Sequence, residues 1–120
     1  MDLNQLADKL VDFTFAYLIS VGDDFHAHTV FVEPVFSDGR LEVGTVGRHT
    51  RENTARHADV TLVWPPRDVG GYSLIVDGRA QQSGEALTIE PTRAVLHRKA
   101  TADSPTTDPA GLHDCVPLKE

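Results

Sequence analysis

The chain has 120 residues, enough for one domain with a single core and too few for two. Acidic residues outnumber basic residues by 18 to 11, and the net charge of -7 argues against a nucleic-acid surface, which normally carries a basic excess. No apolar run reaches the roughly 18 residues of a membrane-spanning helix, so we expect a soluble, cytoplasmic protein without a membrane partner.

The hydrophobic pattern predicts a short N-terminal helix followed by a series of strands. Leu3, Leu6 and Leu10 recur at helical spacing, so residues 2–11 are expected to form an amphipathic helix that covers one mouth of a barrel. Runs of aromatic and β-branched residues, bounded by Gly, Pro and Asp, predict strands at 13–21, 26–36, 41–45, 60–64, 72–80 and 86–97.

Turn-forming residues indicate how these strands are connected. The Asp38-Gly39 pair predicts a tight hairpin between the second and third strands. Pro34 has no N–H to donate, so it is expected at an edge or a bulge of the second strand. Gly78 predicts a bulge or a bend, and Pro91 predicts a kink in the last strand.

The polar run RHTRENTARH, residues 48–57, is typical of a short helix, with Thr50 and Asn53 as candidate capping residues. Residues 101–120 are rich in Pro, Thr, Asp and Gly, and predict an irregular segment that can lie across a partner. The order of elements predicts a mainly β fold, a small closed or partly closed antiparallel barrel in which one helix crosses between the third and fourth strands. We interpret residues 1–120 as one domain, with the barrel in residues 1–100.

The connection into the second helix is the strongest candidate for a binding site. A strand leaves through Gly44 and Gly47 and runs over Arg48 and Arg51 into a helix start. Backbone amides and guanidinium groups gathered at a helix N-terminus can hold a phosphate. The alternative from the residues alone is a solvated helix face whose arginines pair with Glu52 and Asp59.

The order of the predicted helices and strands resembles that of the FMN-binding split barrel of the pyridoxamine 5'-phosphate oxidase family, including its actinobacterial deazaflavin-dependent relatives. The similarity covers roughly residues 10–98 and is most specific at GRHTRENTARHADVTL (47–62), with GYSLIVDGRA (71–80) resembling the strand that follows. The resemblance implies a six-stranded antiparallel split barrel with short flanking helices. It also implies a homodimer in which each cofactor site draws on both subunits.

The same resemblance implies which residues contact a cofactor, FMN or alternatively the deazaflavin coenzyme F-420. Candidates for the phosphate are Arg48, His49, Thr50 and Arg51, with two registers of the family's basic pair left open, at His49 and Thr50 or at Arg48 and His49. Candidates for contact with the ring, on the second and third strands, are His28, Thr29, Val30, Phe31 and Thr45.

Two positions of the second strand depart from the family pattern. Where the oxidases have an arginine and a lysine, this chain has His28 and Glu33. A carboxylate facing a phosphate is unfavourable by about 1 to 4 kcal/mol at 4 Å, depending on the local dielectric. The resemblance therefore implies that Glu33 points elsewhere or that phosphate binding is weakened. The C-terminal elements that bind substrate in true pyridoxamine phosphate oxidases are absent, so pyridoxine metabolism is not predicted.

The predicted function is that of a flavoprotein, an FMN- or deazaflavin-dependent oxidoreductase that acts on a small-molecule redox substrate. The cofactor carries the hydride, so no catalytic side chain is predicted. One alternative is a split-barrel dimer that binds no flavin and has a ligand-binding or structural role. A further alternative is a haem- or tetrapyrrole-binding relative, suggested by the histidines.

Histidine and cysteine pairs raise the question of a metal site. His26 and His28 share a face of a strand, and His113 and Cys115 stand two residues apart. Zinc sites usually show tighter clusters or repeated spacing, so no metal site is predicted. Cys115, the single cysteine, has no assignable base and no possible internal disulfide partner.

Overall fold

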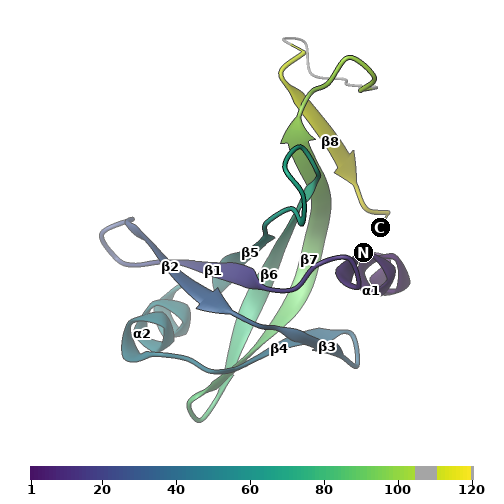
Figure 1. Cartoon of the computed structure of the whole chain (residues 1–120). Coiled ribbons are helices and arrows are strands. Elements are labelled where there is room, and N and C mark those ends of the chain that lie inside the picture. Colours follow the sequence, from purple (N-terminus) through teal and green to yellow (C-terminus); the bar gives the residue numbers. More distant parts are fainter. Residues whose placement is uncertain (105–110, 120) are drawn as a thin grey trace.

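The computed structural model describes residues 1–104 and 111–119, and within them the chain forms one antiparallel sheet flanked by helices (Figure 1). The helices are α1 (Leu3–Leu10) and α2 (Arg48–Arg56). The strands are β1 (Ala16–Val21), β2 (Ala27–Val32), β3 (Val35–Ser37), β4 (Arg40–Thr45), β5 (Asp59–Trp64), β6 (Ser73–Ser83), β7 (Ala86–Lys99) and β8 (His113–Pro117). The predicted mainly β, antiparallel class is confirmed. No described helix has the length and apolarity needed to cross a membrane.

The sheet is ordered β2-β1-β5-β6-β7-β4-β3, with β8 added to β7. Its two ends, β2 and β3, follow one another in the chain and are separated only by Glu33 and Pro34. The stretch from 27 to 37 therefore crosses from one end of the curved sheet to the other, which closes one side of the barrel (Figure 1).

The strand predicted at 26–36 is in fact two strands. β2 pairs with β1, and only β3 forms the predicted hairpin with β4, where Phe36 lies opposite Leu41. The division falls at Pro34 because proline cannot donate a ladder hydrogen bond. The tight turn is confirmed, since Asp38 and Gly39 both have positive φ, at 52° and 77°.

The core lies inside the curved sheet and follows from alternation along the strands. Its inward-facing residues include Leu18, Leu62, Leu74, Val76, Leu87 and Ile89, each no more than 1% exposed. Trp64 is 2% exposed and belongs to the same cluster. α1 adds Leu6, which is fully buried, so the helix is held by its apolar face.

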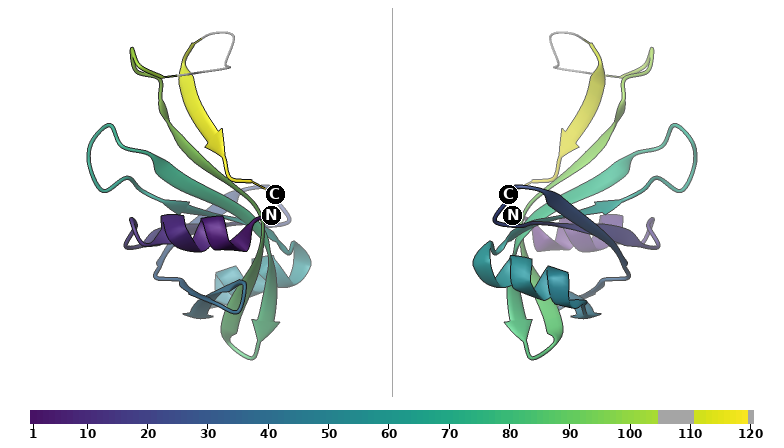
Figure 2. Two further views of the ribbon diagram at one scale, coloured as in Figure 1. Left: turned by 90° about the vertical axis from the view of Figure 1, so that its right-hand side faces the viewer. Right: turned by 90° about the vertical axis from the view of Figure 1, so that its left-hand side faces the viewer.

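The two helices cover opposite ends of the barrel. Figure 2 shows α1 nearest the viewer in one view and α2 nearest in the reverse view. The Asp2 carboxylate begins α1 by accepting from the amides of Asn4 and Gln5, at 3.0 and 3.2 Å. The amide of Asp2 donates to the carbonyl of Lys119 at 2.7 Å, so the N-terminus lies beside residue 119.

The long hairpin of β6 and β7 carries the bulge predicted at Gly78. Asp77 lies opposite Arg93 and Gly78 lies opposite Pro91, so Thr92 is the additional residue on β7. A bulge of this kind increases the local twist, which a closing barrel requires.

Replacement of Gly78 by alanine is expected to destabilise the fold. A Cβ there would lie 2.6 Å from the carbonyl oxygen of Glu90 and 2.6 Å from Cγ2 of Ile89. We expect Gly78→Ala to lower the free energy of unfolding by about 1 to 3 kcal/mol, the usual cost of overpacking. Urea denaturation measures this, with the exposed Glu90→Ala as a control expected to remain within about 0.5 kcal/mol of wild type. Equal stability of the two variants would contradict the packing described at Gly78.

The expectation of an irregular segment over 101–120 is wrong at β8, and residues 105–110 and 120 lie outside the described part. β8 pairs with the second half of β7, with Cys115 opposite His97. The ribbon formed by these strands projects beyond the body of the barrel (Figure 1). The alternation in HDCVP is too short and too polar to have indicated a strand by itself.

A buried carboxylate attaches β8 to the rest of the sheet. Asp114 is 1% exposed and accepts hydrogen bonds from the Tyr72 hydroxyl at 2.8 Å, from the Ser104 hydroxyl at 2.8 Å and from Arg98 Nε at 3.0 Å. These bonds hold the pKa of Asp114 below its ordinary value, and the bond from Tyr72 contributes most. The guanidinium of Arg98 also lies over the Tyr72 ring, 4.2 Å from its centroid.

The Asp114 network predicts a pH-dependent stability. A carboxyl whose pKa is lowered in the folded state stabilises the fold above its unfolded-state pKa, here 3.8, and this contribution disappears as the pH falls through the lowered folded value. We expect Asp114→Asn to lower the melting temperature by several degrees at pH 7, and the gap to wild type to narrow below pH 3.8. Thermal unfolding at a series of pH values measures both. A gap that stays constant down to pH 2 would contradict the assignment.

Candidate functional site

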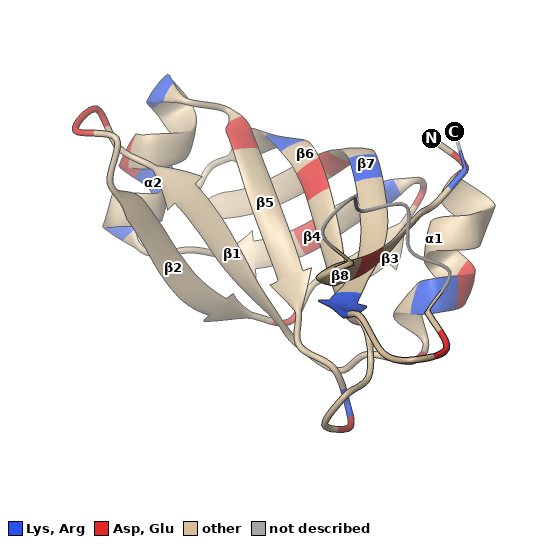
Figure 3. Ribbon diagram, turned by 90° about the horizontal axis from the view of Figure 1, so that it is seen from above, with Lys and Arg blue, Asp and Glu red and all other residues tan. Residues whose placement is uncertain are grey.

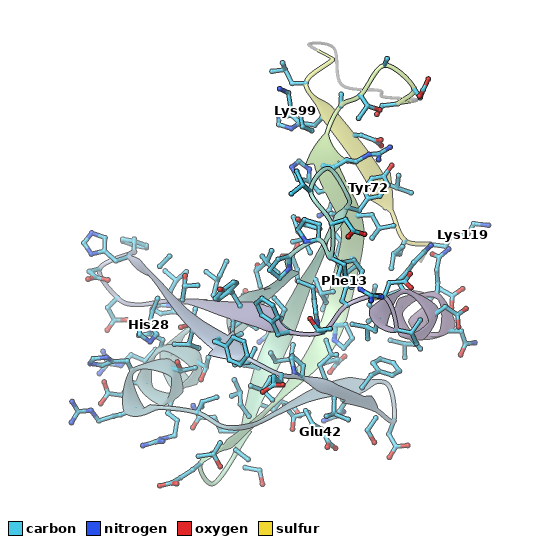
Figure 4. All side chains as sticks on the ribbon, viewed as in Figure 1. Phe13, His28, Glu42, Tyr72, Lys99 and Lys119 are labelled. Atoms are coloured by element: carbon cyan, nitrogen blue, oxygen red, sulfur yellow. The ribbon has the colours of Figure 1, made fainter. Side chains whose placement is uncertain are left out.

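A pocket of about 290 Å³ lies between β2, the end of β4 and the first turn of α2. Its lining includes seven of the nine residues predicted from the sequence: His28, Val30, Phe31, Thr45, Arg48, His49 and Thr50. These residues come from three elements that are far apart in the chain. Figure 4 shows His28 on the side of β2 that faces α2.

Glycines direct the chain from β4 into the helix. Gly44 has a φ of 82°, a left-handed conformation that favours glycine, and the β4–β7 register shifts between Glu42 and Gly44. Val46 is then buried, and Gly47 is the N-cap of α2. A Cβ at Gly47 would have no atom within 4 Å, so the helix start faces open space.

The N-terminus of α2 is uncapped by any side chain. Gly47 offers no side-chain acceptor, and the first intrahelical bond is from the Arg51 amide to the Gly47 carbonyl at 3.0 Å. The amides of Arg48, His49 and Thr50 precede that bond, so the helix itself provides no acceptor for them. Thr50 and Asn53, predicted as caps, instead lie inside the helix, because the helix begins two residues before Thr50.

The Thr50 hydroxyl is buried without a partner. Thr50 is 1% exposed, and its Oγ1 has no hydrogen-bond partner among the described residues. Thr54, one turn later, shows the ordinary alternative, since its hydroxyl donates to the Thr50 carbonyl at 2.8 Å. An unsatisfied buried hydroxyl costs about 1 to 3 kcal/mol. Thr50 is also one of the residues that line the pocket.

The side chains that line the pocket are positively charged or neutral in the described part of the chain. Arg48 and His49 enter it from α2, and no carboxylate belongs to its described lining. The rings of His28 and His49 meet edge to face, 5.6 Å apart at 84°. Arg48 contacts Glu52 only at 3.9 Å, with both side chains largely exposed. Glu33, which departs from the family pattern, is exposed and is not part of the described pocket lining.

Arg51 and Thr29, the other two candidates for cofactor contact, lie outside the described lining of this pocket. The Arg51 guanidinium donates to the Val46 carbonyl at 2.6 Å and thereby holds the connection between β4 and α2. Asp59, suggested as a partner for these arginines, pairs with Arg79 at 3.2 Å. Thr29 is exposed and lies on the face of β2 opposite to His28 and Val30, whereas Phe31, on that same outer face, lies at the edge of the pocket.

α2 is attached to the β1–β2 hairpin at several points. Asn53 donates to the Ser20 hydroxyl at 3.2 Å, and Asp23 accepts from Arg56 and contacts His57 at 2.8 Å. The bond with His57, followed by that with Arg56, holds the pKa of Asp23 below its ordinary value. These contacts orient the helix so that its N-terminus faces β2.

Three residues of the pocket lining were not among the predicted cofactor contacts: Val32, Val46 and Gly47. A glycine directly before a polar helical run is a recognised N-cap signal and identifies Gly47. The two valines carry no comparable signal, because their contribution depends on how β2 and β4 approach α2.

No family model matches the chain. It is 48% identical, over 132 aligned positions, to the uncharacterized proteins Mb0449c of Mycobacterium bovis and MT0457 of Mycobacterium tuberculosis, with 97% of this chain and 93% of each relative covered. The chain belongs to the same family as these two mycobacterial proteins.

The fold of this mycobacterial family is found in solved structures of much lower identity. An F420 reductase matches with a TM-score of 0.62 at 13% identity, covering 72% of this chain and 94% of the other. A putative pyridoxamine 5'-phosphate oxidase from Listeria innocua matches at 0.63 and 16%, covering 78% and 96%. General stress protein 26 from Bacillus anthracis matches at 0.63 and 13%, covering 78% and 92%. The predicted resemblance to oxidase-like split barrels is confirmed for the fold.

Within this member of the family, the other histidines do not assemble a metal site. His26 contacts Asp24 at 3.1 Å, and His97 Nδ1 lies 3.1 Å from the Cys115 sulfur. In residues 1–104 and 111–119, no group of three or more His, Cys, Asp or Glu side chains is arranged to hold a metal ion. The pocket beside α2 offers hydrogen-bond donors and positive charge, the requirements of an anion site.

Proposed function

We propose that this chain binds FMN, or alternatively the deazaflavin coenzyme F-420, by its phosphate at the N-terminus of α2, and acts as an oxidoreductase on a small-molecule redox substrate. The observation that supports this best is the buried, partnerless hydroxyl of Thr50 at an uncapped helix start. The same pocket contains Arg48 and His49 and has no carboxylate in its described lining.

The residues present fit a phosphate group. The free amides of the first helical turn and the positive end of the helix dipole favour an anion. The Thr50 hydroxyl and the guanidinium of Arg48 add one neutral and one charge-assisted donor. The sequence left two alignments of the family's basic pair open, at Arg48 and His49 or at His49 and Thr50. The first is favoured, because Thr50 is buried and contributes a hydroxyl rather than a positive charge.

The chain's own contribution is to bind and orient the cofactor. A bound flavin or deazaflavin supplies the hydride chemistry. The Phe31 edge of the pocket provides an apolar surface beside the phosphate site, and Val32, which is 8% exposed, adds a buried apolar side chain to the lining. No side chain in the described pocket needs to transfer a proton for this role.

We propose further that a second copy of the chain covers the outer face of β1 and β2. Phe15 stacks on Phe31 at 5.1 Å and meets Tyr17 edge to face at 5.7 Å. Phe31 and Tyr17 are 57% and 40% exposed, and Figure 3 shows no Lys, Arg, Asp or Glu on either strand. Because Phe31 also lines the pocket, this aromatic surface continues directly from the phosphate site. A homodimer formed here places the partner beside the cofactor.

Tyr17→Asp tests the dimer. We expect light scattering after gel filtration to give a dimer for wild type and a monomer for the variant, because a carboxylate in an apolar interface is unfavourable. The control is Val69→Asp, which changes a fully exposed residue outside this surface and is expected to leave the dimer intact. A wild-type protein that is monomeric at about 100 µM would overturn the proposal of a dimer.

The proposed cofactor is tested by absorbance and titration. We expect purified protein to show a flavin or deazaflavin band, or to take up FMN or F-420 with saturation when titrated by fluorescence. A Soret band would instead support the tetrapyrrole alternative. A colourless protein that binds neither cofactor would support the alternative of a barrel without a flavin and contradict the proposal.

A further inference from the structure

A second cavity, of about 490 Å³, lies at the opposite end of the barrel from the phosphate pocket. It is formed by the end of α1, the loop before β6 and the part of β7 that pairs with β8, and shares no lining residue with the phosphate pocket. Its polar wall consists of Lys9, Asp12, Arg67 and Asp68. Its apolar wall consists of Phe13, Tyr72 and Leu96.

Arg67 is distinguished from every other arginine of the chain. The other arginines each contact a carboxylate, an amide oxygen or a backbone carbonyl: Arg40, Arg48, Arg51, Arg56, Arg79, Arg93 and Arg98. The Arg67 guanidinium has no hydrogen-bond or ion-pair partner within residues 1–104 and 111–119, and it lines the cavity. A guanidinium in this position is free to bind a carboxylate with two parallel hydrogen bonds.

The carboxylates of the cavity are equally available. Asp12 and Asp68 form no ion pair with another described residue, although Lys9 and Arg67 line the same cavity. Two cationic and two anionic side chains give the wall no net charge. Such a wall suits a ligand that carries both signs better than a simple anion or cation.

The apolar wall is held in place before any ligand arrives. The Tyr72 hydroxyl donates to the buried carboxylate of Asp114 at 2.8 Å, and the same bond raises the pKa of Tyr72. Arg98 lies over the Tyr72 ring, 4.2 Å from its centroid. Figure 4 shows Phe13 beside the end of α1 and Tyr72 alongside the β7–β8 ribbon, where it contacts Arg98 and Asp114. An aromatic ring fixed in this way needs little ordering on binding.

We propose that this cavity binds a free amino acid with an aromatic or aliphatic side chain. Arg67 and Lys9 hold the carboxylate, Asp12 and Asp68 hold the ammonium group, and the side chain lies against Phe13, Tyr72 and Leu96. The volume of the cavity falls within the usual range for small-molecule sites, about 300 to 1,000 Å³. This site does not depend on the proposed flavin site.

L-Phenylalanine titrated into the ¹⁵N-labelled full chain, followed by amide shifts in NMR spectra, tests the proposal. We expect saturable shifts at Phe13, Gly71 and Tyr72, while Gly47 and Thr50 at the phosphate pocket do not move. Hydrocinnamate lacks the ammonium group and phenethylamine lacks the carboxylate, so each is expected to bind at least about fivefold more weakly. Shifts without saturation, or equal binding of the three compounds, would overturn the proposal.

Two substitutions identify the polar contacts. Arg67→Gln and Asp68→Asn each replace an exposed loop residue, so folding is not at issue, and each is expected to weaken L-phenylalanine binding about tenfold. The matched control is Arg93→Gln, an exposed arginine on β7 outside the cavity, which is expected to bind as wild type does. Wild-type affinity in Arg67→Gln, or an equal loss in the control, would contradict the assignment of the carboxylate to Arg67.

Discussion

Joint replacement of Arg48 and His49 by glutamine is expected to weaken FMN binding by about 2 kcal/mol, roughly thirtyfold. Charge-assisted hydrogen bonds to a phosphate contribute about 1.5 to 3 kcal/mol each when buried. Arg48 is largely exposed, and solvent screens its share, so the expected sum is well below two full contributions. The helix amides and the Thr50 hydroxyl remain in the double variant, and binding should weaken without being abolished.

The measurement is quenching of FMN fluorescence at fixed ionic strength, because an anion site loses affinity as salt rises. The matched control is Arg56→Gln, which removes a cation from the last turn of the same helix, where it contacts Asp23. Affinity in the control is expected to stay within about twofold of wild type, since the helix field acts mainly over its first turn. Equal losses in both proteins would indicate a general effect of charge and contradict a local phosphate site.

Replacement of Thr50 by valine is expected to change stability and binding in opposite directions. Valine has nearly the same shape as threonine and removes a hydroxyl that is buried and partnerless in the described structure. The free energy of unfolding without ligand should rise by about 1 kcal/mol, because the cost of the unsatisfied group disappears. FMN affinity should fall about fivefold, because the ligand loses a hydrogen-bond donor.

Urea denaturation without FMN and fluorescence titration with FMN measure the two effects. Thr54→Val provides the comparison, since the Thr54 hydroxyl donates to the Thr50 carbonyl at 2.8 Å and its loss should not stabilise the protein. If Thr50→Val is less stable than wild type and binds FMN unchanged, the hydroxyl has a structural partner and no role in the pocket.

Much of the fold follows from local chemistry. The Asp38-Gly39 turn, the bulge at Gly78 and the alternation along β5 and β6 are readable because each depends on a few neighbouring residues. β8 is different. Its attachment depends on one aspartate, Asp114, reaching partners that are distant in the chain, and composition does not reveal such a network.

Seven of the nine candidate residues chosen from the sequence line one pocket, and two do not. A strand end with two glycines, followed by basic residues and a helix, correctly indicated which elements meet. The sequence does not show that the Arg51 side chain turns back to the Val46 carbonyl, because that choice depends on the path of the loop. The prediction of the helix start was also wrong: Thr50 and Asn53 are good capping residues in isolation, but Gly47 is the N-cap and the helix begins at Arg48.

A crystal structure of the protein grown with excess FMN is the most direct test of the phosphate site. We predict that the phosphate lies within hydrogen-bond distance of the Thr50 hydroxyl and of the first amides of α2, with the Arg48 guanidinium turned toward it. A pocket that contains no phosphate, with Arg48 still paired to Glu52 and the cofactor absent or bound elsewhere, would contradict the account.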